Sequence, residues 1–136
     1  MDYEKLIQFR DNPDFYARLM GVHTLKIGEG FAQAELEVGK EHFNPVGSVH
    51  GGVLFTLADT VSGAASASYG DSITTLNASV NFLRAVREPM MLVGTSVVEK
   101  RGKKVIVVNT EITDEDGTLY FSGTFSFFNL GFPIQL

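Results

Sequence analysis

Hydrophobic and polar residues alternate with a period of two along much of the chain, which is the pattern of strands with one buried face. Residues 31–38 show it clearly, and residues 23–27 are expected to pair with them as a hairpin across Gly28-Glu29-Gly30. Similar runs predict four further strands, at residues 72–83, 90–99, 105–113 and 119–127. The last three are separated by the turn signals Arg101-Gly102 and Asp116-Gly117. The pattern therefore predicts a long antiparallel sheet.

Residues 51–68 follow a helical pattern instead. Apolar residues recur there at helical spacing, and Asp59 is the only ionisable side chain of the segment. A surface helix would carry several charges, so we expect this helix to be buried nearly all round and to be closed by Gly70. Residues 2–10 and 14–20 also have helix-like composition.

Together these elements predict an α+β fold in which a curved antiparallel sheet wraps around one long central helix. No linker, repeat or low-complexity run divides residues 1–136, so we expect a single domain. One helix can cover only one face of such a sheet. We therefore expect a second subunit to bury an edge or part of the other face.

The amino-acid composition excludes several kinds of site and partner. The 136 residues include no cysteine, which excludes disulfides, thiolate metal sites and a cysteine nucleophile. Three histidines without metal-ligand spacing predict no metal site. The net charge of -5 argues against a nucleic-acid partner. A charged N-terminus and the lack of a long apolar stretch predict a cytoplasmic protein with no signal peptide and no membrane partner.

The candidate chemistry lies in residues 42–63. His50-Gly51-Gly52 is where a loop meets the buried helix, and glycines let a ligand approach the backbone. The first turn of a helix has unpaired N–H groups at the positive end of its dipole, so it binds an anion or polarises a carbonyl. Asp59, about two turns further on, is costly in an apolar helix unless it has a partner or reaches a wet cleft.

Each feature also has a purely structural interpretation. The glycines suit tight packing at a loop–helix junction, and His50 suits the start of a helix. Asp59 could be a hydrogen-bonded core residue, and Asn44 before Pro45 could be a turn residue. It is their combination in one segment that favours a site.

The run N-P-x-G-x-x-H-G-G-x-x-x-x-L-x-D, from Asn44 to Asp59, resembles the hotdog-fold acyl-CoA thioesterases of the phenylacetic-acid-degradation type. The predicted order of elements matches that family along the whole chain. The resemblance implies hydrolysis of acyl-CoA to a carboxylic acid and coenzyme A, with no cofactor because coenzyme A is part of the substrate. It also implies a homo-oligomer, either a dimer whose sheets join edge to edge or a dimer of dimers.

The resemblance also implies a role for each matching residue. Gly52 would donate its backbone N–H to the thioester oxygen. Asp59 would act as nucleophile or general base, reaching a site at the dimer interface from the partner subunit. Asn44 would orient water or substrate, His50 would support the thioester or the departing thiolate, and Thr75 would help to hold the water. A thioester has a good leaving group, so one oxyanion donor and one carboxylate could suffice.

The distribution of charge along the chain bears on whether the protein can bind the phosphates of coenzyme A. Six of the 11 Lys and Arg residues lie between residues 84 and 104, and that segment is formally +4 while the rest of the chain is -9. Lys and Arg bind phosphates well, so we expect these residues to flank one cleft mouth; solvated turn charges are the alternative. The predicted substrate-binding residues are Gly51, Arg84, Arg101, Gly102, Lys103 and Lys104.

Several alternatives stay open at this stage. A non-catalytic acyl-CoA binder on the same fold is one, and a hotdog hydratase or dehydratase, or a scaffolding dimer, are others. The acyl specificity, aryl or fatty, is undecided, as is the oligomer size. Residues that could line an acyl cleft are Leu54, Phe55, Val61, Ser62 and Phe82.

Overall fold

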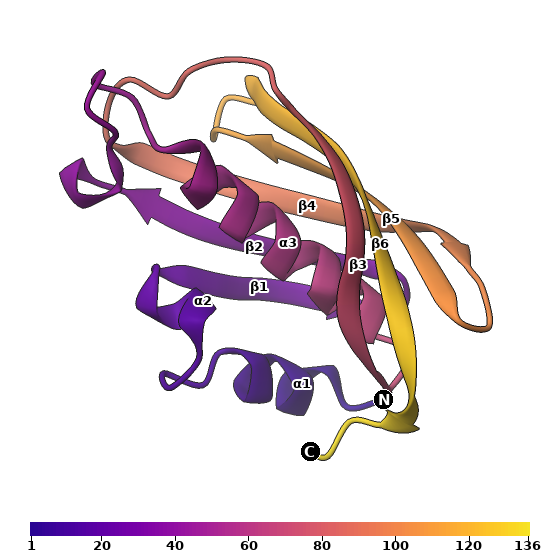
Figure 1. Cartoon of the computed structure of the whole chain (residues 1–136). Helices are drawn as coiled ribbons and strands as arrows, with labels where there is room; N and C mark the ends of the chain where they lie inside the picture. Colours follow the sequence, from indigo (N-terminus) through magenta and orange to yellow (C-terminus); the bar gives the residue numbers. More distant parts are fainter.

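The computed structural model describes all 136 residues, with a six-stranded antiparallel sheet curving around one long helix, α3 (Gly51–Ala67) (Figure 1). The strands are β1 (Val22–Gly28), β2 (Phe31–Val38), β3 (Asp71–Phe82), β4 (Met90–Arg101), β5 (Val105–Thr113) and β6 (Leu119–Pro133). Their order across the sheet is β1-β2-β4-β5-β6-β3. This architecture confirms the predicted α+β arrangement.

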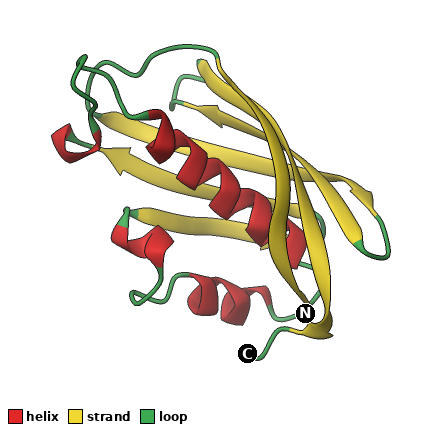
Figure 2. Ribbon diagram, in the orientation of Figure 1, coloured by secondary structure: helices red, strands yellow, loops and turns green.

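Three short helices complete the chain. α1 (Tyr3–Arg10) and α2 (Tyr16–Leu19) lie beside β1, and a 3-10 turn, η1 (Lys40–His42), follows β2 (Figure 2). None of the helices combines the length and apolarity needed to cross a membrane.

Helix α3 is buried on most sides, as its composition predicts. Twelve of its 17 residues are buried, and they pack against the concave face of the sheet. The less buried positions include Gly51, Phe55 and Asp59, which are spaced four residues apart and so share one face of the helix. This open stripe carries the candidate chemistry.

Three buried hydroxyls fix α3 on the sheet. Ser62 of α3 and Ser96 of β4 each lie 2.6 Å from the Thr110 hydroxyl of β5, oxygen to oxygen. All three side chains are fully or almost fully buried. Because buried polar groups need partners, this network favours one rotational setting of the helix over the sheet.

Replacing Thr110 with valine tests that network. Valine keeps the shape but leaves two buried serines short of a partner, so Thr110→Val should lower the free energy of unfolding by about 1–3 kcal/mol. Thr113→Val on the same strand, where no side-chain hydrogen bond is lost, should change it little. Denaturant unfolding measures both, and equal effects would contradict a role for the network.

The edge of the sheet departs from simple alternation. β3 pairs only with β6, and its register shifts between Thr75 and Asn77. Leu76 and Phe82, which the pattern predicts to face inward, are 57% and 54% exposed. A similar shift at the start of β6 exposes Leu119 and buries Tyr120. An unpaired edge strand of 12 residues, with exposed apolar side chains at Leu76 and Phe82, is therefore left along β3.

Candidate functional site

Asp59 and Thr75 meet where α3 faces β3. The Thr75 hydroxyl donates to Asp59 Oδ1 at 2.7 Å, and it is the one side-chain hydrogen bond that the carboxylate accepts. Asp59 is only partly buried. The carboxylate is therefore not a core group satisfied on all sides, and Oδ2 is free to face a ligand or water.

Asp59 and Thr75 line a cavity of about 370 Å³ beneath α1 and α2. Its apolar lining comes from both ends of the chain. The residues around it are Phe9, Arg10, Phe15, Tyr16, Ala17, Asp59, Thr60, Gly63, Ile73, Thr74, Thr75 and Phe127. Such a space, half apolar and with one carboxylate, can hold an acyl group next to a reactive centre.

Arg10 is the one cation in this cavity, and sequence reasoning missed it. Its Nη2 donates to the backbone oxygen of Thr60 at 3.2 Å. Burial lowers the pKa of Arg10, while the negative charges of Asp59 and Asp11 oppose that shift. In the sequence Arg10 looks like an ordinary basic residue in the last turn of a helix. The only available signal was Gly63, whose missing side chain makes room for the guanidinium.

The Gly52 N–H, which is the predicted oxyanion donor, already has an acceptor within the chain. The backbone N–H of Gly52 donates to His50 Nδ1 at 2.8 Å, which makes His50 the N-cap of α3. This supports the structural interpretation of His50. A substrate carbonyl that takes the Gly52 N–H must replace the imidazole as acceptor.

Asn44 organises its own loop. Its Oδ1 accepts from the backbone N–H groups of Val46 and Ser48, both at 3.1 Å, and its Nδ2 donates to Ser48 Oγ at 3.1 Å. The side chain therefore behaves as a turn residue, and within one chain it makes no contact with Asp59.

A second cavity, of about 350 Å³, lies at the N-terminus of α3. Gly51, Leu54, Phe82 and Arg84 are among its lining residues, and Asp59 is not. Gly52 and Asp59 are seven positions apart in the helix, which is about 10 Å along the axis. One chain thus places the start of α3, where the donor lies, and the carboxylate at separate cavities.

The predicted basic rim does not form within one chain. Arg84 lies at the N-terminus of α3, whereas the Arg101 guanidinium stacks 4.1 Å from the ring centre of Tyr69, just past its C-terminus. A 17-residue helix is about 25 Å long, so within one chain Arg84 and the Arg101 turn do not flank the same cleft mouth, and their role in binding stays a prediction. Strand β4 runs the length of α3 and carries the two ends of the basic segment apart (Figure 1).

Lys103 and Lys104 share the β4–β5 turn with Arg101 and so lie at that far end. Glycine is required at position 102 of this turn, because a Cβ would sit 2.5 Å from the backbone oxygen of Val105.

The residues predicted to line an acyl cleft fall into two groups, those buried against the sheet and those nearer the surface. Val61 and Ser62 are fully buried against the sheet, so they cannot line an open cleft. Leu54 and Phe82 line the cavity at the start of α3, and Phe55 packs on the ring of Phe125 with centroids 5.5 Å apart.

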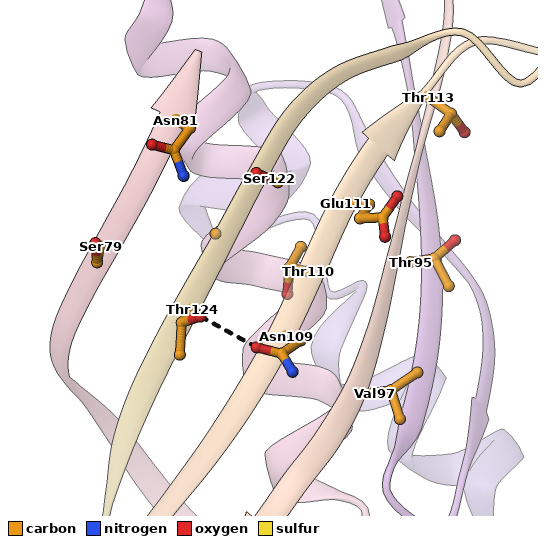
Figure 3. Close-up of a pocket in the computed structure, with 11 residues that line it drawn as sticks. Ser79, Asn81, Thr95, Val97, Asn109, Thr110, Glu111, Thr113, Ser122 and Thr124 are labelled. Atoms are coloured by element: carbon orange, nitrogen blue, oxygen red, sulfur yellow. Dashed lines mark hydrogen bonds between the residues drawn. The ribbon is translucent and has the colours of Figure 1, made fainter. Parts of the chain in front are cut away.

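A larger hollow, of about 580 Å³, lies on the outer face of the sheet (Figure 3). Its lining is mostly hydroxyl and amide groups, among them Thr124, which donates to Asn109 Oδ1 at 3.1 Å. Glu111 is its only charged residue, and none of the predicted site residues reaches it. Size alone therefore does not make it the reactive site.

Comparisons with known proteins fit this geometry. The acyl-coenzyme A thioesterase PaaI of Escherichia coli is 32% identical over 102 residues, covering 75% of this chain and 73% of PaaI. The solved structure of E. coli PaaI superposes with a TM-score of 0.90 at 27% identity, covering 97% and 95% of the two chains. A hypothetical thioesterase from Streptococcus pneumoniae, solved with coenzyme A, gives a TM-score of 0.79 at 29% identity, covering 84% and 92%.

These neighbours confirm the hotdog fold and the resemblance seen in the sequence. The family model described as "Thioesterase superfamily" matches residues 46–121, which include helix α3 with Asp59, and Thr75. The chain therefore belongs to the thioesterase superfamily, which confirms the prediction of a thioester hydrolase.

Proposed function

We propose that this protein is an acyl-CoA thioesterase that uses Asp59 and the backbone N–H of Gly52 from two different chains. The observation that carries the proposal is the Asp59–Thr75 pair, because it sets the only ionisable group of α3 at a partly apolar cavity. The substrate class rests on PaaI, an acyl-coenzyme A thioesterase, and on the S. pneumoniae protein with coenzyme A.

The reaction needs a water or carboxylate attack on the thioester carbon. Thr75 holds Oδ1 of Asp59, so Oδ2 either takes a proton from water or attacks the carbon itself. The carbonyl oxygen becomes an oxyanion and is stabilised by the Gly52 N–H at the start of the α3 dipole. The C–S bond then breaks, and coenzyme A leaves as a thiolate that takes up a proton. If water is the nucleophile, the free acid forms in this step; if Asp59 is the nucleophile, an anhydride between the acyl group and Asp59 forms, and water hydrolyses it to release the acid and restore the carboxylate.

Two features support a site built from two chains. Gly51 and Asp59 line different cavities of one chain. The β3 edge is unpaired and carries two exposed apolar side chains, Leu76 next to Thr75 and Phe82 at the other end of the strand near the start of α3. Edge-to-edge pairing would cover these side chains and bring a partner close to the Asp59 cavity.

A partner chain also offers a way to reunite the basic residues. Arg84 and the Arg101 turn lie at opposite ends of α3 in one chain, so a two-fold axis perpendicular to the sheet edge, which pairs the two edge strands antiparallel, would bring one chain's Arg84 end nearer the other's Arg101 end. Arg and Lys there would bind the phosphates of coenzyme A.

Thiol release from a panel of acyl-CoAs tests the proposal. Saturable release that exceeds the uncatalysed rate, with free acid formed in equal amount, is the expected result. Tight binding without thiol release would instead identify a non-catalytic acyl-CoA binder.

Thr75 provides a finer test. Removing a hydrogen bond to a charged group typically costs about 1.5–3 kcal/mol, but Thr75 is exposed, so Thr75→Ala should lower kcat/KM roughly tenfold, near the low end. Thr75→Ser keeps the hydroxyl and should stay close to wild type. If the serine variant loses as much as the alanine variant, the hydroxyl is not what matters.

A further inference from the structure

Arg10 is a partly buried cation without a contact anion. Its Nε is fully buried and has no hydrogen-bond partner, and no carboxylate oxygen lies within 4.0 Å of its nitrogens. Buried charges are normally paired, because desolvation costs several kcal/mol per ion. Nη1 also makes no hydrogen bond within the chain and, unlike Nε, is not fully buried, so the guanidinium presents an unused donor at the cavity wall where it can receive an oxygen acceptor.

Arg10 and its neighbours line the same cavity as Asp59 and Thr75. Phe9, Phe15 and Tyr16 line it together with Arg10, and an edge-to-face contact joins Phe9 and Phe15 with centroids 5.8 Å apart. A Cβ at Gly63 would lie 3.0 Å from Arg10 Nη2, so the glycine leaves the guanidinium its space. The cation is thus fitted between α1 and α3.

The cavity combines two parts of the chain. Asp59 and Thr75 fall within the region matched by the family model, residues 46–121, whereas Phe9, Arg10, Phe15 and Tyr16 precede it. The part shared with the family carries the chemistry. The N-terminal helices supply the wall that an acyl group would meet beyond the thioester.

We propose that Arg10 is a specificity-determining residue, which selects acyl-CoA thioesters whose acyl group carries an oxygen acceptor away from the thioester. The inference rests on the proposed function. The apolar wall accepts the carbon chain, and the guanidinium donates to a hydroxyl or carboxylate oxygen at its far end. A plain hydrocarbon acyl group would displace water from the Nη1 donor without offering it an acceptor.

Three matched substrates test this with the full-length protein: hexanoyl-CoA, 6-hydroxyhexanoyl-CoA and adipoyl-CoA. Wild type should hydrolyse at least one oxygenated substrate with a kcat/KM about tenfold or more above that for hexanoyl-CoA, since a charged hydrogen bond discriminates by that much. Comparing 6-hydroxyhexanoyl-CoA with adipoyl-CoA shows whether Arg10 prefers a hydroxyl or a carboxylate oxygen. Arg10→Met, which keeps the bulk without the donors, should bring the ratio close to one.

Lys5→Met is the matched control, because Lys5 is exposed on the same helix and its loss should leave the ratio at the wild-type value. Thermal unfolding checks that each variant folds. An equal rate on all three substrates by wild type overturns the inference while the proposed function stands. A preference that persists in folded Arg10→Met also overturns it, and marks Arg10 as an anchor of α1 alone. If no acyl-CoA is hydrolysed at all, both proposals fail.

Discussion

Asp59→Asn should lower kcat for acyl-CoA hydrolysis by about 10³-fold, within the 10²–10⁴ range of a lost acid–base group. Asparagine keeps an oxygen at the Oδ1 position for the Thr75 hydroxyl, so the shape of the site is preserved. What it loses is the negative charge that takes up a proton or attacks the carbon. Thiol release under saturating substrate measures the effect.

The loss must be specific to this carboxylate. Asp116→Asn changes the same charge in an exposed turn, and it should keep the wild-type rate. Thermal unfolding should show that both variants are folded. A folded Asp59→Asn protein with the wild-type rate would mean that the Asp59 carboxylate neither activates the water nor attacks the thioester.

Gly52→Pro should lower kcat/KM by about 10²–10³, the loss seen when one oxyanion donor is removed from other enzymes. Proline removes the N–H that we assign to the thioester oxygen, and the first turn of a helix tolerates it best. Circular dichroism and thermal unfolding check that α3 still forms.

Gly52→Ala is the matched control. A Cβ there would sit 2.9 Å from His50 Nδ1, so both substitutions push the imidazole aside, but only proline removes the N–H. The alanine variant should therefore keep most of the activity. Equal losses in the two variants would assign the effect to His50 or to packing rather than to the backbone donor.

Much of the fold was predictable because burial imposes a clear periodicity. Helix α3 was expected over residues 51–68 and spans 51–67, and the hairpin turns fall where Gly102 and Gly117 occur. Alternation fails where a sheet edge or a register shift decides exposure, as at Leu76 and Leu119. β6 also runs to Pro133, six residues past its expected end, because its pairing with β3 extends there.

The site was less predictable because it depends on distances across the fold. Local spacing was enough to single out Asp59, and Thr75 lies within hydrogen-bond distance of it. Spacing along the chain could not show that Arg84 and Arg101 diverge, since that depends on the direction of β4. It placed His50 at the start of the helix but could not show that its imidazole accepts from the Gly52 N–H. Arg10 was missed because an arginine that is partly buried at the end of a short helix has the same sequence signature as a fully exposed one.

The measurement that tests the two-chain site most directly is complementation between inactive variants. Asp59→Asn and Gly52→Pro chains, unfolded together and refolded, should form mixed dimers in which one of the two sites has an intact Asp59 and an intact Gly52. Random mixing would then restore about one quarter of the wild-type activity, although each variant alone is nearly inactive. Activity that stays at the level of the separate variants, while mixed dimers are detected by mass, would contradict a site shared between chains.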